Sequence, residues 1–311
     1  MEILPRAASG APSRIVVVGT LNHLDSAAAL CRAAGMEAWT VPIDTYPGAA
    51  RWLLSRDFWR ADAVFQCGTG GVKYILAARL FGKPLIRHWI GTDAWTFLAD
   101  RSPLRRLRCW LARRGPALHL FVTDEMARGL AEVGIEGTVV RYVTRAMHAA
   151  SEPLPKEFSV LTYWLPGRRS FYGGDVVLAL ARELPEVRFR VLGVTDPEDA
   201  EPPPNVELLG FVDDIEAVVR RASVLIRMPQ TDGAPNLPIE MLARGRYVIY
   251  NKPLPGCHLA RDLDEARRAL AEIRTLRAAN DTGARFVREE CTLEHQAATL
   301  AKAIDRWCSA R

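Results

Sequence analysis

Short apolar runs alternate along this chain with longer segments in which apolar residues recur at helical spacing. Apolar runs of about 4–8 residues, bounded by glycine, proline or charged residues, are typical of buried strands. In the first half, these runs predict strands at residues 14–19, 37–41, 61–66, 85–88, 119–123 and 138–142. In the second half, they predict strands at residues 159–163, 189–193, 206–209, 223–228 and 247–251. Because strands that alternate with helices form parallel, doubly wound sheets, the pattern predicts an α/β fold.

The alternation is interrupted between residues 144 and 156, where Pro153 and Pro155 indicate a linker. We therefore expect two Rossmann-like domains, residues 1–150 and residues 151–311, which is consistent with a length of 311 residues. Sheets of this kind bind ligands at the carboxyl ends of their strands. The expected binding site is a central cleft that both domains face.

The final segment with helical periodicity covers residues 293–307. One side of this helix carries its apolar residues, which are Leu293, Ala297, Leu300, Ile304 and Trp307. Such a face must be buried against a partner, and one interpretation has this C-terminal helix return to the first domain.

Composition narrows the class of protein. A hydrophobic content of 49% and a charged content of 25% are those of a globular protein. No apolar run approaches the roughly 18 residues that a membrane-spanning helix needs, and we expect no secretory leader. The six cysteines are scattered without metal-ligand spacing, so we expect reduced thiols, no zinc site and a cytoplasmic location.

The positive charge is concentrated in the first half. Residues 1–150 carry 19 Lys and Arg against 12 Asp and Glu, whereas residues 151–311 carry 22 against 24. The first half is therefore the one expected to meet an anionic surface. The alternative, that these are solvated arginines without a partner, stays open.

The segment at residues 230–240 holds two acids on either side of a turn. Asp232 and Gly233 form a turn signal, and Asn236 is a favourable N-cap for a helix that ends before Gly245. We expect Glu240 in the first turn of this helix. The free N–H groups of a helix N-terminus attract anions, and a carboxylate accepts hydrogen bonds from sugar hydroxyls. A phosphorylated, hydroxyl-rich ligand would suit this segment.

Further landmarks precede and follow this segment in a fixed order. Gly167 and Arg168 follow the first strand of the second half, a strand ends at Gly193, and residues 205–214 precede the acidic segment. A small-residue helix and an apolar strand follow it. This series resembles the nucleotide-sugar-binding domain of the retaining glycosyltransferases of family four, which have an acid, seven positions and then Glu. The resemblance implies a GT-B fold and transfer of a sugar from a nucleoside diphosphate sugar to a glycan or lipid-linked acceptor.

The resemblance also implies roles for particular residues. Glu240 would hold the ribose hydroxyls of the donor, and Asp232 would face the hydroxyls of its sugar. Arg168 would pair with the diphosphate, since its bidentate fork suits phosphate oxygens. The segment of Gly233, Ala234, Pro235, Asn236 and Leu237 would meet the diphosphate or the sugar, with backbone N–H donors at each position except Pro235. No metal and no other cofactor is expected.

The sequence departs from the family at two positions. The family has Lys five residues after the arginine, where this chain has Gly173, and Arg169 is a candidate replacement. The family often has a histidine at the position of Ile90, directly before a Gly-Ser/Thr-Asp turn. The nearest histidine here is His88, which lies two positions earlier and therefore on the same face of a strand.

Two more residues of the first half are candidates. Asp93 is either a catalytic residue or a cap for the helix that follows. Gly19 ends the first strand, and the resemblance places its loop near the donor diphosphate. The glycines at residues 68–71 do not form a dinucleotide fingerprint, because Lys73 stands where the third glycine would be.

The segment from Arg101 to Arg114 predicts a basic amphipathic helix. Such a helix suits an anionic membrane surface, which would place the protein peripherally at the inner face of the cell membrane. A core-facing helix with solvated arginines is the alternative. Nucleic-acid binding is not expected, because no nucleic-acid module accompanies the patch.

Two alternative functions remain open from the sequence. One is a sugar-nucleotide epimerase of the same fold. The other is a catalytically weak protein that binds nucleotide sugars, which the residues at 173 and 90 would favour.

Overall fold

The computed structural model describes residues 11–19, 21–42, 44–45, 49–68, 72–103, 117–196 and 201–310. The chain divides into two compact units. Unit 1 comprises Met1–Val143 and Cys291–Arg311, and unit 2 comprises Thr144–Glu290. The expected division into residues 1–150 and 151–311 differs from this at both ends of unit 2. Residues 144–150 belong to unit 2, and residues 291–311 belong to unit 1.

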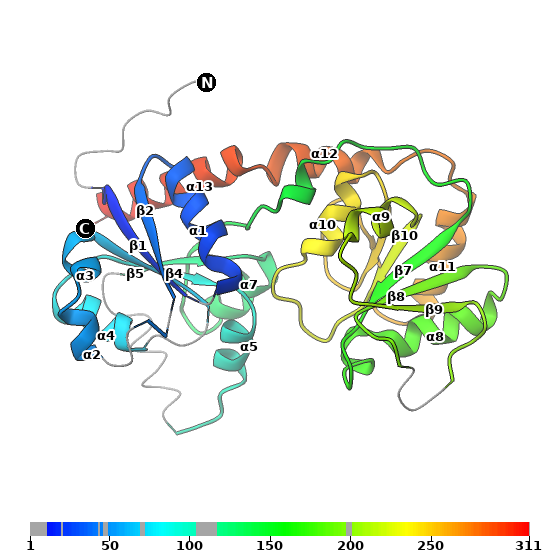
Figure 1. Cartoon of the computed structure of the whole chain (residues 1–311), viewed down its shortest axis with the longest axis horizontal. Coiled ribbons are helices and arrows are strands. Elements are labelled where there is room, and N and C mark those ends of the chain that lie inside the picture. Colours follow the sequence, from blue (N-terminus) through cyan, green and yellow to red (C-terminus); the bar gives the residue numbers. More distant parts are fainter. Residues whose placement is uncertain are drawn as a thin grey trace. The chain divides into compact units, whose positions relative to one another are not determined.

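Unit 1 contains a six-stranded parallel sheet among its described residues, in the order β2-β1-β3-β4-β5-β6 (Figure 1). The strands are β1 (Arg14–Gly19), β2 (Glu37–Pro42), β3 (Ala63–Cys67), β4 (Leu85–Trp89), β5 (Ala117–Phe121) and β6 (Thr138–Val139). The helices are α1 (Leu21–Ala33), α2 (Ala49–Leu53), α3 (Arg56–Arg60), α4 (Val72–Leu80), α5 (Thr92–Ala99), α7 (Asp124–Ala131) and α13 (Leu293–Ser309). The predicted doubly wound α/β sheet is confirmed for this half of the chain.

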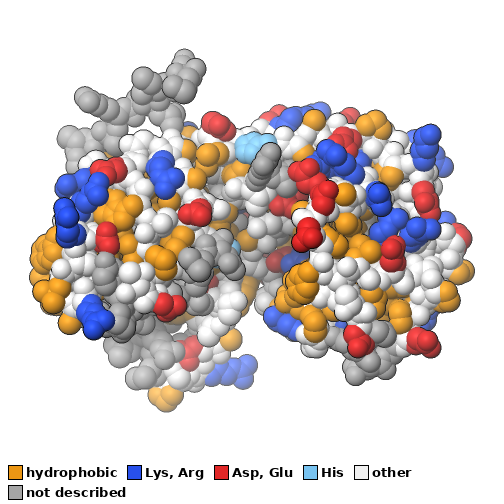
Figure 2. Space-filling view, viewed as in Figure 1, with side chains coloured by type: hydrophobic (Ala, Val, Ile, Leu, Met, Phe, Trp, Pro, Cys, Tyr) orange, Lys and Arg blue, Asp and Glu red, His pale blue; other side chains and the backbone are white. Residues whose placement is uncertain are grey.

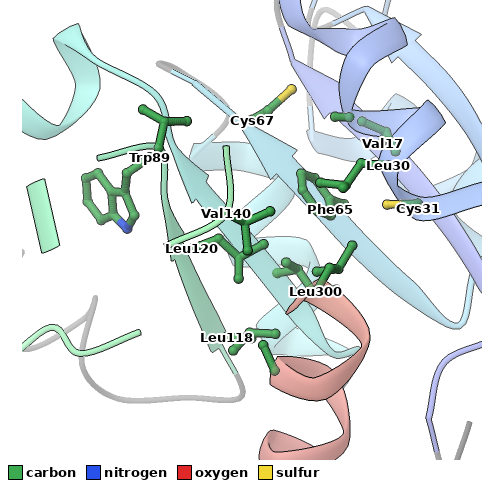
Figure 3. Packing of buried hydrophobic residues seen from close by; sticks show 14 of the residues in the cluster. Val17, Leu30, Cys31, Phe65, Cys67, Trp89, Leu118, Leu120, Val140 and Leu300 are labelled. Carbon is green, nitrogen blue, oxygen red and sulfur yellow. The ribbon is translucent and has the colours of Figure 1, made fainter. Parts of the chain in front are cut away.

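The core of unit 1 contains strand residues from the first half of the chain together with residues of the C-terminal helix α13. Figure 3 shows Val17 of β1, Phe65 of β3 and Leu120 of β5 packed together with Leu300 of α13. Helix α13 also contacts α1, beside which it runs in Figure 1. The return of the C-terminal helix to the first domain is therefore confirmed. Its apolar face, predicted from helical spacing, buries Leu300 and Ile304 almost completely.

Unit 2 contains a second six-stranded parallel sheet, in the order β12-β11-β10-β7-β8-β9. The strands are β7 (Ser159–Tyr163), β8 (Arg188–Leu192), β9 (Val206–Gly210), β10 (Val224–Arg227), β11 (Tyr247–Tyr250) and β12 (His258–Leu259). The α-helices are α8 (Gly174–Glu183), α9 (Ile215–Arg220), α10 (Asn236–Ala243), α11 (Leu263–Thr275) and α12 (Asp281–Glu290). Two 3₁₀ turns, η1 (Arg145–His148) and η2 (Ser170–Tyr172), precede β7 and α8.

The predicted linker is held to unit 2 by ion pairs. Glu152 accepts a hydrogen bond from Arg244 Nη1 at 3.0 Å, and Arg246 donates to the backbone oxygens of Glu152 and Pro153. Both arginines are at most 3% exposed. The linker is therefore an ordered part of unit 2.

Apolar surface on unit 1 gathers over the short helices α2, α3 and α4. Leu54, Trp59, Leu80 and Phe81 are 45–86% exposed, and the Trp59 ring packs edge-on against Phe81. Figure 2 shows hydrophobic surface at its left edge, where α2 and α3 lie in Figure 1.

Among the described residues, no helix combines the length and apolar character needed to cross a membrane.

Candidate functional site

A pocket of about 300 Å³ opens at the carboxyl ends of the unit 2 strands. Tyr163, Leu192 and Arg227 line it, and they are the last residues of β7, β8 and β10. Its other lining residues are Gly193, Gly210, Phe211, Val212, Ile215, Ala234, Asn236, Leu237 and Glu240. A larger pocket of about 490 Å³ includes Arg188 and Val206, which begin β8 and β9. Because doubly wound sheets bind ligands at carboxyl ends, position favours the smaller pocket as the functional one.

The floor of this pocket requires a glycine at residue 193. Gly193 has a φ of 90°, and a Cβ atom there would lie 2.3 Å from the carbonyl oxygen of Trp164. Any side chain would clash with the backbone that follows β7. Glycine at this position therefore allows the two backbone segments to approach closely beside the pocket.

Helix α10 presents its N-terminus to the same pocket. Ala234, Asn236 and Leu237 line the pocket wall. The predicted N-cap is wrong by one residue, because Pro235 occupies the cap and Asn236 is the first helical residue. Gly245 ends the helix as predicted, with a φ of 71°. Asn236 donates its N–H to the Ala234 carbonyl oxygen at 2.8 Å and Pro238 has no N–H, so the Leu237 N–H and the helix dipole are what this first turn offers to an anion.

Glu240 places a carboxylate on the pocket wall. It follows the first turn of α10 rather than lying in it, since the helix begins four residues earlier. Its Oε1 accepts a hydrogen bond of 2.7 Å from the Thr144 hydroxyl. Within the described residues, its Oε2 accepts none. This oxygen is therefore available to a ligand hydroxyl, whereas Thr144 fixes the direction of the carboxylate.

Asp232, by contrast, is engaged by protein groups. Its Oδ2 accepts hydrogen bonds from Arg227 Nε at 2.8 Å and from the Tyr250 hydroxyl at 2.9 Å. Its Oδ1 accepts from Arg227 Nη2 at 3.0 Å, and the residue is only 5% exposed. The contact with the donor sugar, inferred from the resemblance, stays a prediction. The interaction that the structure shows for Asp232 is a buried bidentate pair with Arg227.

The two arginines after β7 point in different directions. Arg168 is exposed, and its guanidinium carbon lies 4.0 Å from the ring centroid of Phe171. Arg169 Nε donates to Asp175 Oδ1 at 2.9 Å, in the first turn of α8. The pairing of Arg168 with a diphosphate stays a prediction. The candidate replacement of the family's lysine by Arg169 also stays a prediction, but its charge is already paired with Asp175.

Gly173 has a structural reason to be glycine. Its φ is 79°, and a Cβ atom there would lie 2.6 Å from Met228 Cβ and 2.8 Å from the Met228 carbonyl oxygen. A lysine in this backbone would be strained and would clash. The departure from the family at this position is therefore built into the path of the chain.

His88 of unit 1 is completely buried. Its neutral ring donates from Nε2 to the carbonyl oxygen of Val140 at 2.8 Å and contacts the ring of Tyr142. Burial lowers its pKa from 6.5 to about 3, so the imidazole is uncharged near neutral pH. The contact of His88 with a donor sugar stays a prediction, and the structure shows the side chain buried in the core of unit 1.

Asp93 and Gly19 also have structural explanations. Asp93 Oδ1 accepts hydrogen bonds from the backbone N–H groups of Ile90 and Gly91 at 3.0 and 2.9 Å, immediately before α5. Gly91 is the N-cap of α5 and has no side-chain cap hydrogen bond, so Asp93 lies in the first turn and reaches back to the N–H groups that precede it. A Cβ atom on Gly19 would lie 2.3 Å from Cys67 Sγ, so β1 and β3 require glycine there. Catalytic or ligand-binding roles for these two residues stay predictions.

Some predicted features fall outside the described residues. They are residues 104–114 of the basic amphipathic segment and residues 69–71 of the glycine segment. In the described ranges, no three His, Cys, Asp or Glu side chains gather closely enough to hold a metal ion.

Comparison with known proteins identifies the fold. No family model matches the sequence, and no curated protein matches it. A sucrose-phosphate synthase from Thermosynechococcus elongatus superposes with a TM-score of 0.68 at 12% identity, over 96% of this chain and 100% of that chain. Anabaena HepE in complex with UDP-glucose gives 0.66 at 12% identity, over 96% and 100%. The chain therefore has the GT-B fold of glycosyltransferases.

One structure of another activity also resembles this chain. A UDP-GlcNAc 2-epimerase from Neisseria meningitidis, bound to UDP-GlcNAc, superposes with a TM-score of 0.57 at 11% identity. The match covers 94% of this chain and 99% of that chain. At such identities the resemblance establishes the fold, and the activity has to be argued from the pocket.

Proposed function

We propose that this protein is a retaining glycosyltransferase that transfers a sugar from a nucleoside diphosphate sugar to a glycan or lipid-linked acceptor. The observation that carries the proposal is the pocket at the carboxyl ends of β7, β8 and β10, where Glu240 lies beside the N-terminus of α10. The Glu240 carboxylate suits the ribose hydroxyls, and the helix N-terminus suits phosphate oxygens. HepE, whose structure holds UDP-glucose, supports this choice of donor class.

The proposed reaction uses charge stabilisation rather than a metal ion. As the bond from the sugar to the diphosphate breaks, negative charge develops on the leaving diphosphate. The Leu237 N–H group and the dipole at the start of α10, together with the cation of Arg168, would stabilise that charge in the transition state. Retention without a protein nucleophile would rest on this stabilisation and on the positions of donor and acceptor.

The test is removal of the pocket carboxylate. A thermal-shift screen of nucleoside diphosphates and their sugars first identifies the donor, because a ligand of the folded state raises the melting temperature. Glu240→Ala is then expected to weaken binding of that donor about 10- to 100-fold, the value of one or two hydrogen bonds to a charged group. Isothermal titration calorimetry measures it.

A matched control is Glu207→Ala. Glu207 is half exposed and pairs with Arg190 at the other pocket, so its removal should leave donor affinity unchanged. Equal affinity of Glu240→Ala and the wild-type protein would contradict the assignment of the pocket.

Epimerisation is the second candidate, favoured by the similarity to the UDP-GlcNAc 2-epimerase. Incubation with the donor alone separates the two, since an epimerase converts the sugar without an acceptor. Transfer or hydrolysis above background would exclude a protein that only binds the nucleotide sugar.

Peripheral attachment to an anionic membrane through residues 101–114 remains part of the proposal, with vesicle co-sedimentation as its measurement.

A further inference from the structure

Arg227 is a charged residue at the end of an otherwise apolar strand. It is the last residue of β10, its side chain is 11% exposed, and it lines the pocket that holds Glu240. A cation is expensive to bury, so this position needs a reason beyond packing. A ligand of negative charge in this pocket would be such a reason, because Arg227 lines the pocket.

The Arg227 guanidinium is held in one orientation. Nε and Nη2 donate to the two oxygens of Asp232, and Tyr250 donates its hydroxyl to the same carboxylate. Nη1 donates to no atom of the described residues. The guanidinium carbon lies 5.6 and 5.5 Å from the ring centroids of Tyr163 and Tyr172. Two donors are thus used for orientation, and the third nitrogen remains for a ligand.

Arg227 also lies beside the position from which a cation is missing. Tyr172, whose ring it approaches, directly precedes Gly173, where a side chain would clash with Met228. Arg169 is paired with Asp175. The Arg168 guanidinium carbon lies 5.5 Å from the same Tyr172 ring centroid. Arg168 and Arg227 therefore both lie next to one aromatic ring at the entrance to α8.

The charges of this region agree with that arrangement. Burial acts to lower the pKa of Arg227, but the charge and hydrogen bonds of Asp232 outweigh it and raise that pKa. Burial raises the pKa of the Tyr163 hydroxyl, whereas the charges of Arg227 and Arg168 act to lower it. Both arginines are thus within electrostatic reach of the pocket lining.

We propose that Arg227 binds the diphosphate of the donor in place of the lysine that Gly173 excludes, and that Asp232 is the positioning residue that orients it. The inference rests on the proposed function and deepens it. It gives the first acid of the motif a different task, because Asp232 acts through Arg227 instead of contacting the sugar. Arg168 and Arg227 would then form a pair of cations for one diphosphate.

The test compares affinity for a nucleoside diphosphate with affinity for its nucleoside. The probe is whichever of UDP, GDP, ADP and dTDP raises the melting temperature of the wild-type protein most. The variant is Arg227→Met combined with Asp232→Asn, because removal of the arginine alone would leave a buried, unpaired carboxylate. We expect the diphosphate affinity to fall about 10- to 100-fold and the nucleoside affinity to stay within about twofold.

A matched control replaces another arginine–carboxylate pair of unit 2. Arg190→Met with Glu207→Gln removes a pair whose arginine is 13% exposed but which lies away from the pocket of Glu240. This variant should bind the diphosphate and the nucleoside as the wild-type protein does. A similar loss in both double variants would overturn the specific role of Arg227.

Asp232→Asn alone separates positioning from contact, and it serves if the double variant does not fold. If Asp232 positions Arg227, affinity for the diphosphate and for its sugar conjugate should fall by the same factor. A loss confined to the sugar conjugate would overturn the positioning role. An unchanged ratio of diphosphate affinity to nucleoside affinity would overturn the role of Arg227. A wild-type protein that binds none of the four probes would overturn the proposed function and this inference with it.

Discussion

The buried imidazole of His88 should make the stability of unit 1 depend on pH. Burial, opposed by the hydrogen bond to Val140 and assisted by the nearby His23, lowers the pKa of His88 from 6.5 to about 3. The folded protein therefore keeps the ring neutral, whereas the unfolded chain takes up a proton near pH 6.5. The contribution to stability is fully present above pH 6.5 and is lost progressively as the pH falls towards 3.

The size of the effect follows from the two pKa values. At pH 5.0, protonation of the unfolded chain lowers the free energy of unfolding by about 2 kcal/mol through His88 alone. At pH 7.5 the same contribution is below about 0.1 kcal/mol. The loss between the two pH values is a large fraction of the roughly 5–15 kcal/mol that stabilises a typical domain.

The assay is guanidinium unfolding at pH 7.5 and 5.0, followed by tryptophan fluorescence. Seven of the eight tryptophans belong to unit 1, and only Trp164 belongs to unit 2, so the signal reports mainly on unit 1. His88→Gln keeps a donor for the Val140 carbonyl and does not titrate. It should lose about 2 kcal/mol less than the wild-type protein between the two pH values. The exposed His295, replaced by Gln, is the control, and equal pH dependence of wild type and His88→Gln would refute the reasoning.

Two further predictions concern packing. Leu300→Ala should lower the free energy of unfolding of unit 1 by about 2–5 kcal/mol, because Leu300 is fully buried. The control is Leu54→Ala: Leu54 is 86% exposed, so this change should alter the same free energy by less than about 0.5 kcal/mol in the fluorescence assay. Gly173→Ala should destabilise unit 2 by about 1–3 kcal/mol, because strain at its φ of 79° is added to a clash with Met228. Gly167→Ala has a similar φ but open space around the new methyl group, so it should destabilise unit 2 less than Gly173→Ala does. Hydrogen exchange of unit 2 amides measures both losses of stability, and equal losses would contradict the clash.

The apolar runs predicted the strands well because each run has clear ends. The predicted strands at residues 14–19 and 159–163 coincide with β1 and β7. Helices α2 and α3 were not predicted, since five residues each are too few to show helical periodicity. The cap of α3, where Ser55 Oγ accepts from the Phe58 N–H group, was a signal that could have revealed it.

The site was predictable where the spacing of a motif marks a residue, and not where a role depends on which side chains pair. The spacing of the motif identified Glu240, which the structure places in the pocket wall. It did not identify Arg227, which lies five residues before Asp232 and pairs with it, nor Tyr250, which β11 brings to the same carboxylate beside β10. The available signal was a single arginine within an apolar run. For His88, the period of a strand predicts a face, but it does not predict depth, which depends on Tyr142 and the rest of the core.

The return of α13 to unit 1 reverses the usual order in which domains are completed during synthesis. Unit 2 is one continuous stretch, so its whole core exists once residue 290 has left the ribosome. The core of unit 1 still lacks Ala297, Leu300, Ala303 and Ile304 at that moment. Domains generally fold as units, most often the N-terminal one first. Here the first half of the chain completes its core only after residues 291–311 have followed unit 2 in synthesis.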